Sequence, residues 1–252
     1  MNHPRIPFRY MSIGILGACL GSAGHASATG ACAATSPRTV VPVIELYTSE
    51  GCNSCPPADR WLSALKAAPE VIALAFHVDY WDRLGWKDRF ASTAFTERQA
   101  TQQASTGARF SYTPQVIVDG RDRKDWPSLR LSGTSRQAAT VDVSLTRDGE
   151  RFVASVVPNA AAPKRLAAYW AVTEQGHVTA VKAGENEGAT LRHDFVVRDY
   201  ATVPAWAGRA GAAETLRFAP TSRADPAHPR SVNLVVVDAV SGRPVQALKL
   251  AC

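Results

Sequence analysis

The sequence has no internal run of eighteen apolar residues, which excludes a protein that crosses a membrane several times. It also has no block of five like charges, no internal repeat and no low-complexity tract. The formal charge of +6 is therefore scattered along the chain, and we expect no nucleic-acid partner. Methionine is scarce, with two residues, and no second C-x-x-C or histidine pair stands at zinc-ligand spacing. What is present, 46% hydrophobic and 20% charged residues in a chain of 252, is typical of a folded protein with a sizeable core.

The first 28 residues have the pattern of a bacterial signal peptide. Two arginines and an apolar run over 10–20 precede an A-x-A site that ends at Ala28. We expect cleavage there, a periplasmic or secreted location, and no membrane span in the mature chain. An alternative is a lipoprotein box over 16–19, which would give Cys19 a lipid anchor.

Cysteine usage agrees with an oxidising compartment. Removal of the signal peptide leaves four of the five cysteines, an even number. Cys52 and Cys55 form a pair by their spacing, and by elimination Cys32 and Cys252 would join the two ends of the chain. The alternative for the second pair is two free thiols at frayed ends.

The chain divides into two predicted units after a linker over 29–38. Over 39–138, apolar strands alternate with helices, which predicts an α/β domain with parallel strand pairs. The strands are expected over 40–47, 71–78 and 115–118, and the helices over 56–67 and 95–105.

Over 139–252, short strands follow one another without helical spacing. The pattern begins with a hairpin at Asp148-Gly149 and predicts an all-β antiparallel sandwich-like domain. The strands are expected at about 141–145, 152–156, 165–173, 178–182, 190–198, 214–218, 231–238 and 244–250.

The chemistry is centred on the C-x-x-C motif, which stands between a strand and a helix. There Cys52 would lie at the helix N-terminus, exposed and stabilised as a nucleophilic thiolate, and Cys55 would be shielded and resolve a mixed disulfide. Asn53 and Ser54 are uncharged and do not indicate the direction of electron flow. No cofactor or bound metal is needed. The alternatives are a structural disulfide or half of a zinc site.

The order strand, C-x-x-C, helix, strand, helix, then Tyr112-Thr113-Pro114 before a strand that ends at Asp119-Gly120, resembles the thioredoxin and glutaredoxin fold. The resemblance implies a cis Pro114 that faces the dithiol and a Thr113 backbone edge that pairs with substrate. The expected fold class is therefore an α/β thioredoxin-like domain followed by an all-β antiparallel sandwich-like domain.

A narrower set of motifs looks like a secreted thioredoxin-like family catalogued as domain of unknown function 1223. These motifs are ELYTS at 45–49, GC at 51–52, SCPPAD at 54–59, FHVDYWD at 76–82, LGWKD at 84–88, YTPQ at 112–115 and GEN at 184–186. The family has no settled activity, so the resemblance implies no substrate. The run over 121–130 departs from the fold, because it is more charged than a hydrophobic edge strand.

Polar and aromatic residues after the second strand are expected near Cys52, because strand ends of a parallel sheet share one edge. His77 or Asp79 would shuttle protons for the thiols, and the alternative for His77 is a core histidine with satisfied hydrogen bonds. Trp81 and Trp86 would either line a substrate groove or pack between the two units.

Three further acidic positions are weighed in the same way. Glu45, in the first strand, needs a partner if it is buried, and would either tune the dithiol or serve the structure. Asp59 is expected to face solvent. Glu185 and Glu187 occupy a glycine-flanked loop that we expect to be exposed.

The sequence therefore predicts an exported thiol-disulfide oxidoreductase whose partners are protein thiols and disulfides in the periplasm. One alternative is a copper-handling protein with Cys52, Cys55 and His77 as ligands. The other is a non-catalytic binding module on a thioredoxin-like scaffold.

Overall fold

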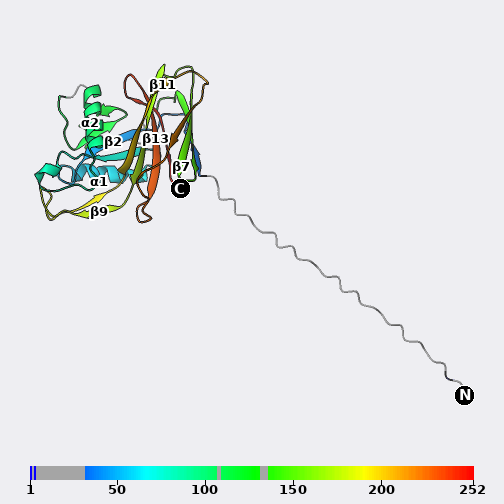
Figure 1. Ribbon diagram of the computed structural model, residues 1–252, viewed down its shortest axis with the longest axis horizontal. Helices are drawn as coiled ribbons and strands as arrows, with labels where there is room; N and C mark the ends of the chain where they lie inside the picture. Colours follow the sequence, from blue (N-terminus) through cyan, green and yellow to red (C-terminus); the bar gives the residue numbers. More distant parts are fainter. Residues whose placement is uncertain (2, 4–31, 107–108, 131–135) are drawn as a thin grey trace. The chain divides into compact units, whose positions relative to one another are not determined.

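An eight-stranded mixed sheet is the largest element of the computed structural model, which describes residues 1, 3, 32–106, 109–130 and 136–252 (Figure 1). Its strand order is β14-β13-β8-β11-β3-β2-β4-β5. The strands are β2 (Val43–Thr48), β3 (Ile72–His77), β4 (Gln115–Val118), β5 (Arg121–Asp122), β8 (Arg165–Glu174), β11 (Val196–Ala207), β13 (Arg230–Asp238) and β14 (Pro244–Leu250). Apart from residues 1 and 3, the predicted signal peptide, with the alternative lipid site at Cys19, lies outside the described residues.

The most apolar strands lie inside this sheet. All six residues of β2 and all six of β3 are buried, as is typical of parallel strands covered on both faces. The two strands run parallel, with Thr48 beside His77, and β4 pairs antiparallel with the other edge of β2. The C-terminal ends of β2 and β3 therefore lie side by side, and the loops that follow them build the candidate site.

Strand β11 connects the two predicted units. Its Val196 pairs parallel with Ala75 of β3, and the rest of the strand pairs antiparallel with β8. The sheet thus continues from strands within 43–122 into strands within 165–250. Residues Ala31–Cys252 accordingly form one compact unit.

The expected fold class, an α/β thioredoxin-like domain followed by an all-β antiparallel sandwich-like domain, is wrong. The described residues are mostly β-strands in large sheets, with two α-helices. The charged run over 121–130 supplies only β5 and one 3-10 turn, η3 (Trp126–Ser128), and no α-helix follows there. The physical reason is that periodicity shows which face of a strand is buried, but not which strand will lie beside it.

A second sheet packs against β8, β13 and β14 and encloses the larger apolar core with them. Its order is β1-β6-β7-β12, and the expected hairpin joins β6 to β7 through Gly149, whose φ is +60°. The alternating exposure of β7 confirms the period-two pattern of the sequence. The strands are β1 (Ala33–Thr35), which lies within the predicted linker, β6 (Val141–Asp148), β7 (Arg151–Pro158) and β12 (Glu214–Phe218).

Both predicted helices are present. Helix α1 (Pro56–Ala64) opens with two prolines, whose missing N–H groups are harmless in a first turn, and buries Ala58 and Leu62. It ends in a 3-10 turn, η1 (Leu65–Ala67). Helix α2 (Thr93–Thr106) begins two residues before the predicted start, and the 3-10 turn η2 (Asp82–Leu84) precedes it.

One predicted strand, over 190–198, is in fact two. β10 (Thr190–His193) pairs with β9 (His177–Ala180) in a separate small sheet, and β11 starts at Val196 in the large one. Between them Phe195 has a φ of +56°, a conformation that side chains rarely adopt. The chain changes sheets at this turn, which periodicity alone did not reveal.

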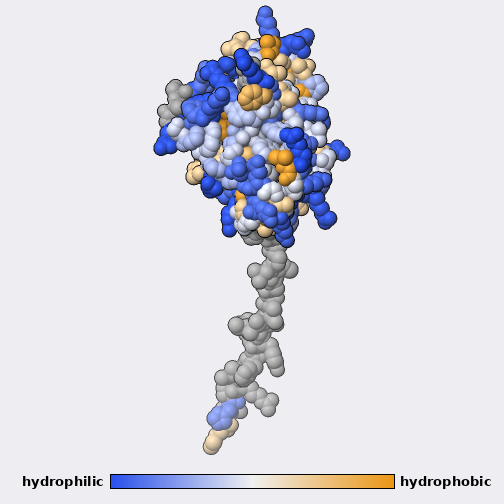
Figure 2. Space-filling model, turned by 90° about the vertical axis from the view of Figure 1, so that its left-hand side faces the viewer, coloured by the Kyte–Doolittle hydropathy of each residue, from blue (hydrophilic) through white to orange (hydrophobic). Residues whose placement is uncertain are grey.

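A disulfide between Cys32 and Cys252 joins the two ends of the described fold. Cys32 directly precedes β1, and Cys252 is the last residue after β14. The surface drawn in Figure 2 is mostly hydrophilic, with hydrophobic groups scattered over it. Among the described residues, no helix combines the length and the apolar character needed to cross a membrane.

Candidate functional site

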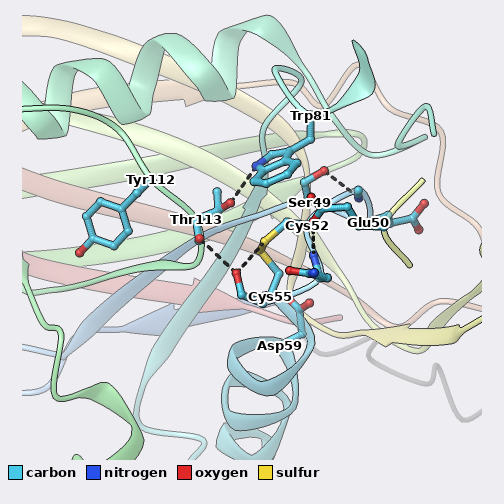
Figure 3. Close-up of a disulfide and its surroundings, with 12 residues drawn as sticks. Ser49, Glu50, Cys52, Cys55, Asp59, Trp81, Tyr112 and Thr113 are labelled. Atoms are coloured by element: carbon cyan, nitrogen blue, oxygen red, sulfur yellow. Dashed lines mark hydrogen bonds between the residues drawn. A yellow bond between two sulfur atoms is a disulfide. The ribbon is translucent and has the colours of Figure 1, made fainter. Parts of the chain in front are cut away.

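The Cys52–Cys55 disulfide lies in the loop that joins β2 to α1 (Figure 3). Cys55 is the N-cap of α1, and its amide donates to the Cys52 carbonyl over 3.2 Å. Gly51 lets this loop pass close to Trp81, because a Cβ at position 51 would lie 3.2 Å from the Trp81 Cβ. Pro56 and Pro57 have no N–H groups, and the amides of Ala58 and Asp59 donate to the Cys55 carbonyl. The dipole of α1 is therefore what favours negative charge on a reduced cysteine here.

Both cysteines are enclosed by protein. Cys52 and Cys55 are each 0% exposed, so the expectation of an exposed Cys52 is wrong for this disulfide form. Part of the cover is the exposed Ser54, whose Oγ lies 3.4 Å from the Cys52 sulfur and donates to the Thr113 carbonyl over 3.5 Å. One small side chain therefore lies directly against the disulfide.

Thr113, the residue before Pro114 in the loop that leads to β4, lies near the disulfide. The peptide bond between them is cis, and the Thr113 carbonyl accepts the Ser54 hydroxyl (Figure 3). Tertiary structure thus brings two predicted site segments together, the C-x-x-C and the Thr113-Pro114 pair.

Two tryptophans brace these loops. The Trp81 indole N–H donates to Thr113 Oγ1 over 2.8 Å, and the Trp86 indole N–H donates to Glu50 Oε2 over 2.8 Å. Both side chains are half-buried. Their N–H groups are thus committed to residues on either side of the disulfide.

The loop over 184–187 holds the cysteine loop from another side. Asn186 donates to the carbonyls of Glu50 and Cys52 over 2.8 and 3.0 Å, and Glu185 accepts the amide of Asn53 over 3.1 Å. Glu185 and Glu187 are exposed, as expected, whereas Asn186 is buried. The C-x-x-C turn is therefore fixed by a segment far along the chain.

His77, the last residue of β3, forms a buried ion pair with Asp88. The distance between Nδ1 and Oδ2 is 2.6 Å, and both side chains are fully buried. Asp88 also accepts the amides of Glu50 and Phe90, each over 2.9 Å. Burial raises the pKa of Asp88, but the His77 charge and these donors outweigh it and lower that pKa to about 2. Burial lowers the pKa of His77, yet Asp88 outweighs burial and raises it.

The Asp88→Asn variant should therefore lose stability in a pH-dependent way. The Asp88 contribution is present above pH 3.8 and disappears as the pH falls through about 2. The His77 contribution is present below pH 6.5 and disappears as the pH rises through the raised pKa. We expect a loss of ~2 kcal/mol in the free energy of unfolding at pH 5 and a smaller loss at pH 9, measured by urea denaturation.

The matched control is Asp142→Asn, at an exposed position of β6, which should change stability little at either pH. An Asp88→Asn loss that is equal at pH 5 and pH 9 would contradict the charged pair.

A cluster of acids and imidazoles lies next to this pair. His193 Nε2 is 3.5 Å from Glu50 Oε1, His193 Nδ1 is 3.9 Å from Asp59 Oδ2, and the His193 and His77 rings are 5.0 Å apart. Asp59 is 6% exposed, so the expectation that it faces solvent is wrong, and burial raises its pKa. We call Glu50, Asp59, His77, Asp88 and His193 the acid–imidazole cluster.

Several atoms of this cluster lack a hydrogen-bond partner within the described part of the chain: Glu50 Oε1, His77 Nε2 and both ring nitrogens of His193. Buried polar atoms without partners are costly and rare in folded proteins. Their concentration behind the cysteine loop is typical of a functional site rather than of a packed core.

Asp79 and Glu45 serve other parts of the fold. The Asp79 carboxylate accepts the hydroxyls of Thr93 and Thr96, each over 2.6 Å, which lowers its pKa and anchors the start of α2. Glu45 is 3% exposed, pairs with Arg98 and accepts the hydroxyls of Tyr47 and Tyr169. The contacts of both acids therefore favour a structural role.

The described residues contain no group of three or more cysteine, histidine or acidic side chains arranged to hold a metal ion. His77 Nδ1 is committed to Asp88. No contact in the structure favours the copper-handling alternative over thiol chemistry.

Fold and site define a mixed-sheet protein with an enclosed C-x-x-C disulfide at a helix start. Residues 43–237 match the family described as protein of unknown function (DUF1223), and the chain belongs to this family. It is similar to a crystal structure from Agrobacterium tumefaciens, a structural-genomics target, with 28% identity and a TM-score of 0.62. The match covers 85% of this chain and 95% of that one. No curated protein matches.

Sequence reasoning missed four members of the acid–imidazole cluster, and Asp88 entered it only as a letter of the LGWKD motif. Asp59 follows Cys55 by four residues, a spacing that places it on the same side of the helix, so it could have been identified. Glu50 stands two residues before Cys52 without a pattern of its own. His193 gave no signal, because only the pairing of β10 brings it under α1.

Proposed function

We propose that this protein is an exported thiol-disulfide oxidoreductase that exchanges electrons with cysteine-bearing proteins through Cys52 and Cys55. The observation that carries the proposal is the C-x-x-C disulfide at the start of α1, with an under-satisfied acid–imidazole cluster behind it. A disulfide that only staples the fold needs neither a helix N-terminus nor a buried cluster of acids and imidazoles with unsatisfied atoms nearby.

The exchange balances in either direction. In the reduced protein, the Cys52 thiolate attacks a substrate disulfide, a mixed disulfide forms, and one substrate sulfur leaves as a thiolate that takes up a proton. Cys55 then loses its proton and attacks Cys52, which restores the Cys52–Cys55 disulfide and releases the second substrate thiol. The reverse sequence oxidises a substrate dithiol and leaves the protein with two thiols.

Access to the sulfur atoms requires movement of the groups that enclose them, and Ser54 is one that is weakly held. The Ser54 contacts of 3.4 and 3.5 Å are long for hydrogen bonds, so little free energy holds this side chain in place. When Ser54 turns away, the Thr113 carbonyl is free to accept a substrate amide beside the disulfide. The cover therefore excludes water from the disulfide at rest and is compatible with attack by a docked thiolate.

The acid–imidazole cluster supplies a place for the proton that each exchange releases or takes up. Asp59 lies one turn after Cys55 on α1, and its raised pKa brings proton binding closer to neutral pH. His193 lies within 4 Å of both Asp59 and Glu50, so a proton can pass between them. These are positioning residues, because none of them exchanges a sulfur bond.

The reduction potential of Cys52–Cys55 tests the proposal, and the chain contains a matched control. Equilibration with dithiothreitol or glutathione buffers, followed by alkylation and mass spectrometry, measures both disulfides in one sample. We expect Cys52–Cys55 above about −300 mV and Cys32–Cys252 below that value, the range typical of structural disulfides. A Cys52–Cys55 potential equal to or below that of Cys32–Cys252 would identify a structural bridge and defeat the proposal.

Export is part of the same proposal. The signal pattern that ends at Ala28 and the pairing of all four later cysteines support a periplasmic or secreted location. The N-terminal mass of the protein recovered from a bacterial host distinguishes cleavage after Ala28 from a lipid-modified Cys19.

A further inference from the structure

A cavity of about 620 Å³ is separated from the acid–imidazole cluster by Phe90. Phe90 contacts His193 of the acid–imidazole cluster on one side, with ring centroids 5.9 Å apart, and His177 of the cavity on the other, at 4.7 Å. The cavity walls come from β9, the start of β11 and the loop over 223–228. Its volume is in the range of small-ligand sites.

Positive charge dominates the cavity. Three arginines line it, Arg89, Arg198 and Arg223, against two acids, Glu174 and Asp225. The charge of Glu174 is already balanced by two ion pairs. Arg198 lies 3.4 Å from Glu174, and Arg230, which lies behind the wall, is 3.5 Å from it.

Two arginines of the cavity have no acidic partner among the described residues. Within the described residues, no carboxylate lies at ion-pair distance from Arg89 or Arg223, and both are exposed at the cavity. Arg89 contacts only neutral groups, the Phe90 ring at 4.5 Å and the Val178 carbonyl at 3.4 Å. The guanidinium groups are free to bind an oxyanion, for which their planar donor geometry is suited.

A buried histidine in the cavity wall, His177, needs a hydrogen-bond donor from the ligand. His177 is 4% exposed, and its Nε2 lies 3.2 Å from the Glu174 carboxylate, which can only accept, so Nε2 carries the proton. Its Nδ1 is buried and has no hydrogen-bond partner in the described chain. In the neutral ring this nitrogen carries a lone pair that needs a hydrogen-bond donor. His228 stacks on the same ring, with centroids 3.7 Å apart.

We propose that this cavity binds a phosphate group, as inorganic phosphate or as a phosphomonoester. Below about pH 6 a phosphate group, free or in a monoester, retains a P–OH, which can donate to His177 Nδ1 while its other oxygens accept from Arg89 and Arg223. Sulfate and carboxylate offer acceptors only, and they leave the histidine lone pair unpaired.

The charges around the cavity agree with this assignment. Burial, together with the positive charges of His228, Arg198 and Arg89, lowers the pKa of His177 to about 4, so its ring is neutral at pH 7. A neutral ring accepts a hydrogen bond, which is the role that the hydrogen phosphate requires.

Isothermal titration calorimetry at pH 5.5, where both phosphate probes keep a P–OH, tests the proposal in a low-salt, phosphate-free buffer, with inorganic phosphate, glycerol 3-phosphate and sulfate as probes. We expect saturable binding of at least one phosphate probe, with sulfate at least about tenfold weaker because one hydrogen bond is missing. Tighter binding of inorganic phosphate identifies the free ion as the ligand class, and tighter binding of glycerol 3-phosphate identifies a phosphomonoester.

The exposed arginines provide variants that should fold normally. Arg89→Gln and Arg223→Gln should each weaken phosphate binding about tenfold, and Arg209→Gln, an exposed arginine elsewhere, should leave it unchanged. No saturable phosphate binding, sulfate binding as tight as phosphate, or an equal loss in Arg209→Gln would overturn the proposal. None of these outcomes depends on the redox activity of Cys52 and Cys55.

Discussion

A Cys55→Ser variant is expected to accumulate covalent complexes with disulfide-bearing proteins, because Cys52 still attacks and no resolving sulfur follows. On non-reducing gels these complexes should appear as bands of higher mass that disappear with reductant. The disulfide of the wild-type protein places the two sulfur atoms within bonding reach, which is the geometry that resolution needs. Insulin reduction by Cys55→Ser should fall by at least about 10³-fold, as when a member of a catalytic unit is removed.

Cys52→Ser is the informative partner of this experiment. It retains one cysteine of the motif but lacks the nucleophile, so it should trap nothing and should lose insulin reduction to the same extent. The double variant Cys32→Ser/Cys252→Ser controls for the loss of a disulfide as such and should retain activity. Equal trapping by the two single variants, or no trapping by either together with an inactive wild type, would refute the assignment of Cys52 as nucleophile.

Arg98→Met should be the most destabilising single substitution outside the cysteines. Arg98 lies beside the fully buried Glu45 carboxylate, donates to Tyr200 Oη over 2.7 Å and stacks over the Tyr169 ring at 4.0 Å. The Arg98 charge overcomes the effect of burial and lowers the pKa of Glu45, so the acid is ionised at neutral pH. Removal of Arg98 would leave a buried charge unpaired, which costs about 3–5 kcal/mol in the free energy of unfolding.

Two comparisons make this prediction specific. Arg123→Met removes an exposed pair with Asp125, at 2.8 Å, and should change stability far less than Arg98→Met does. The double variant Glu45→Gln/Arg98→Met removes both charges and should lose less stability than Arg98→Met alone. Urea denaturation at pH 7 measures all three, and a double variant that is less stable than Arg98→Met would contradict an unpaired charge as the cause.

The local elements of the fold were predictable, because each is determined by the residues within it. The buried run before the cysteines became β2, the two prolines opened α1, and the alternating residues after 140 became β6 and β7. The disagreement arose where one residue changes the direction of the chain. Phe195 divides a predicted strand, and the second part, β11, pairs parallel with β3.

The candidate site divides in the same way. Cys52, Cys55 and the Thr113-Pro114 pair were identified from spacing and order along the chain. Their surroundings were not, because Asn186 and His193 come from loops and strands whose position depends on long-range pairing. Asp79 has a regular position after β3, yet hydroxyls at the start of α2 occupy its carboxylate.

The sequence alone indicated membership of an uncharacterised family, the redox-capable C-x-x-C at a helix start, and most of the strands and helices. These features depend on residues that are neighbours in sequence. Only the tertiary structure showed that both halves share one sheet and that Ser54 lies against the disulfide. It also showed that acids and imidazoles gather behind the disulfide and that a cationic cavity lies beyond Phe90. These features join residues far apart in the sequence. Their interactions form only after folding has removed water from buried polar groups, which must then pair with one another.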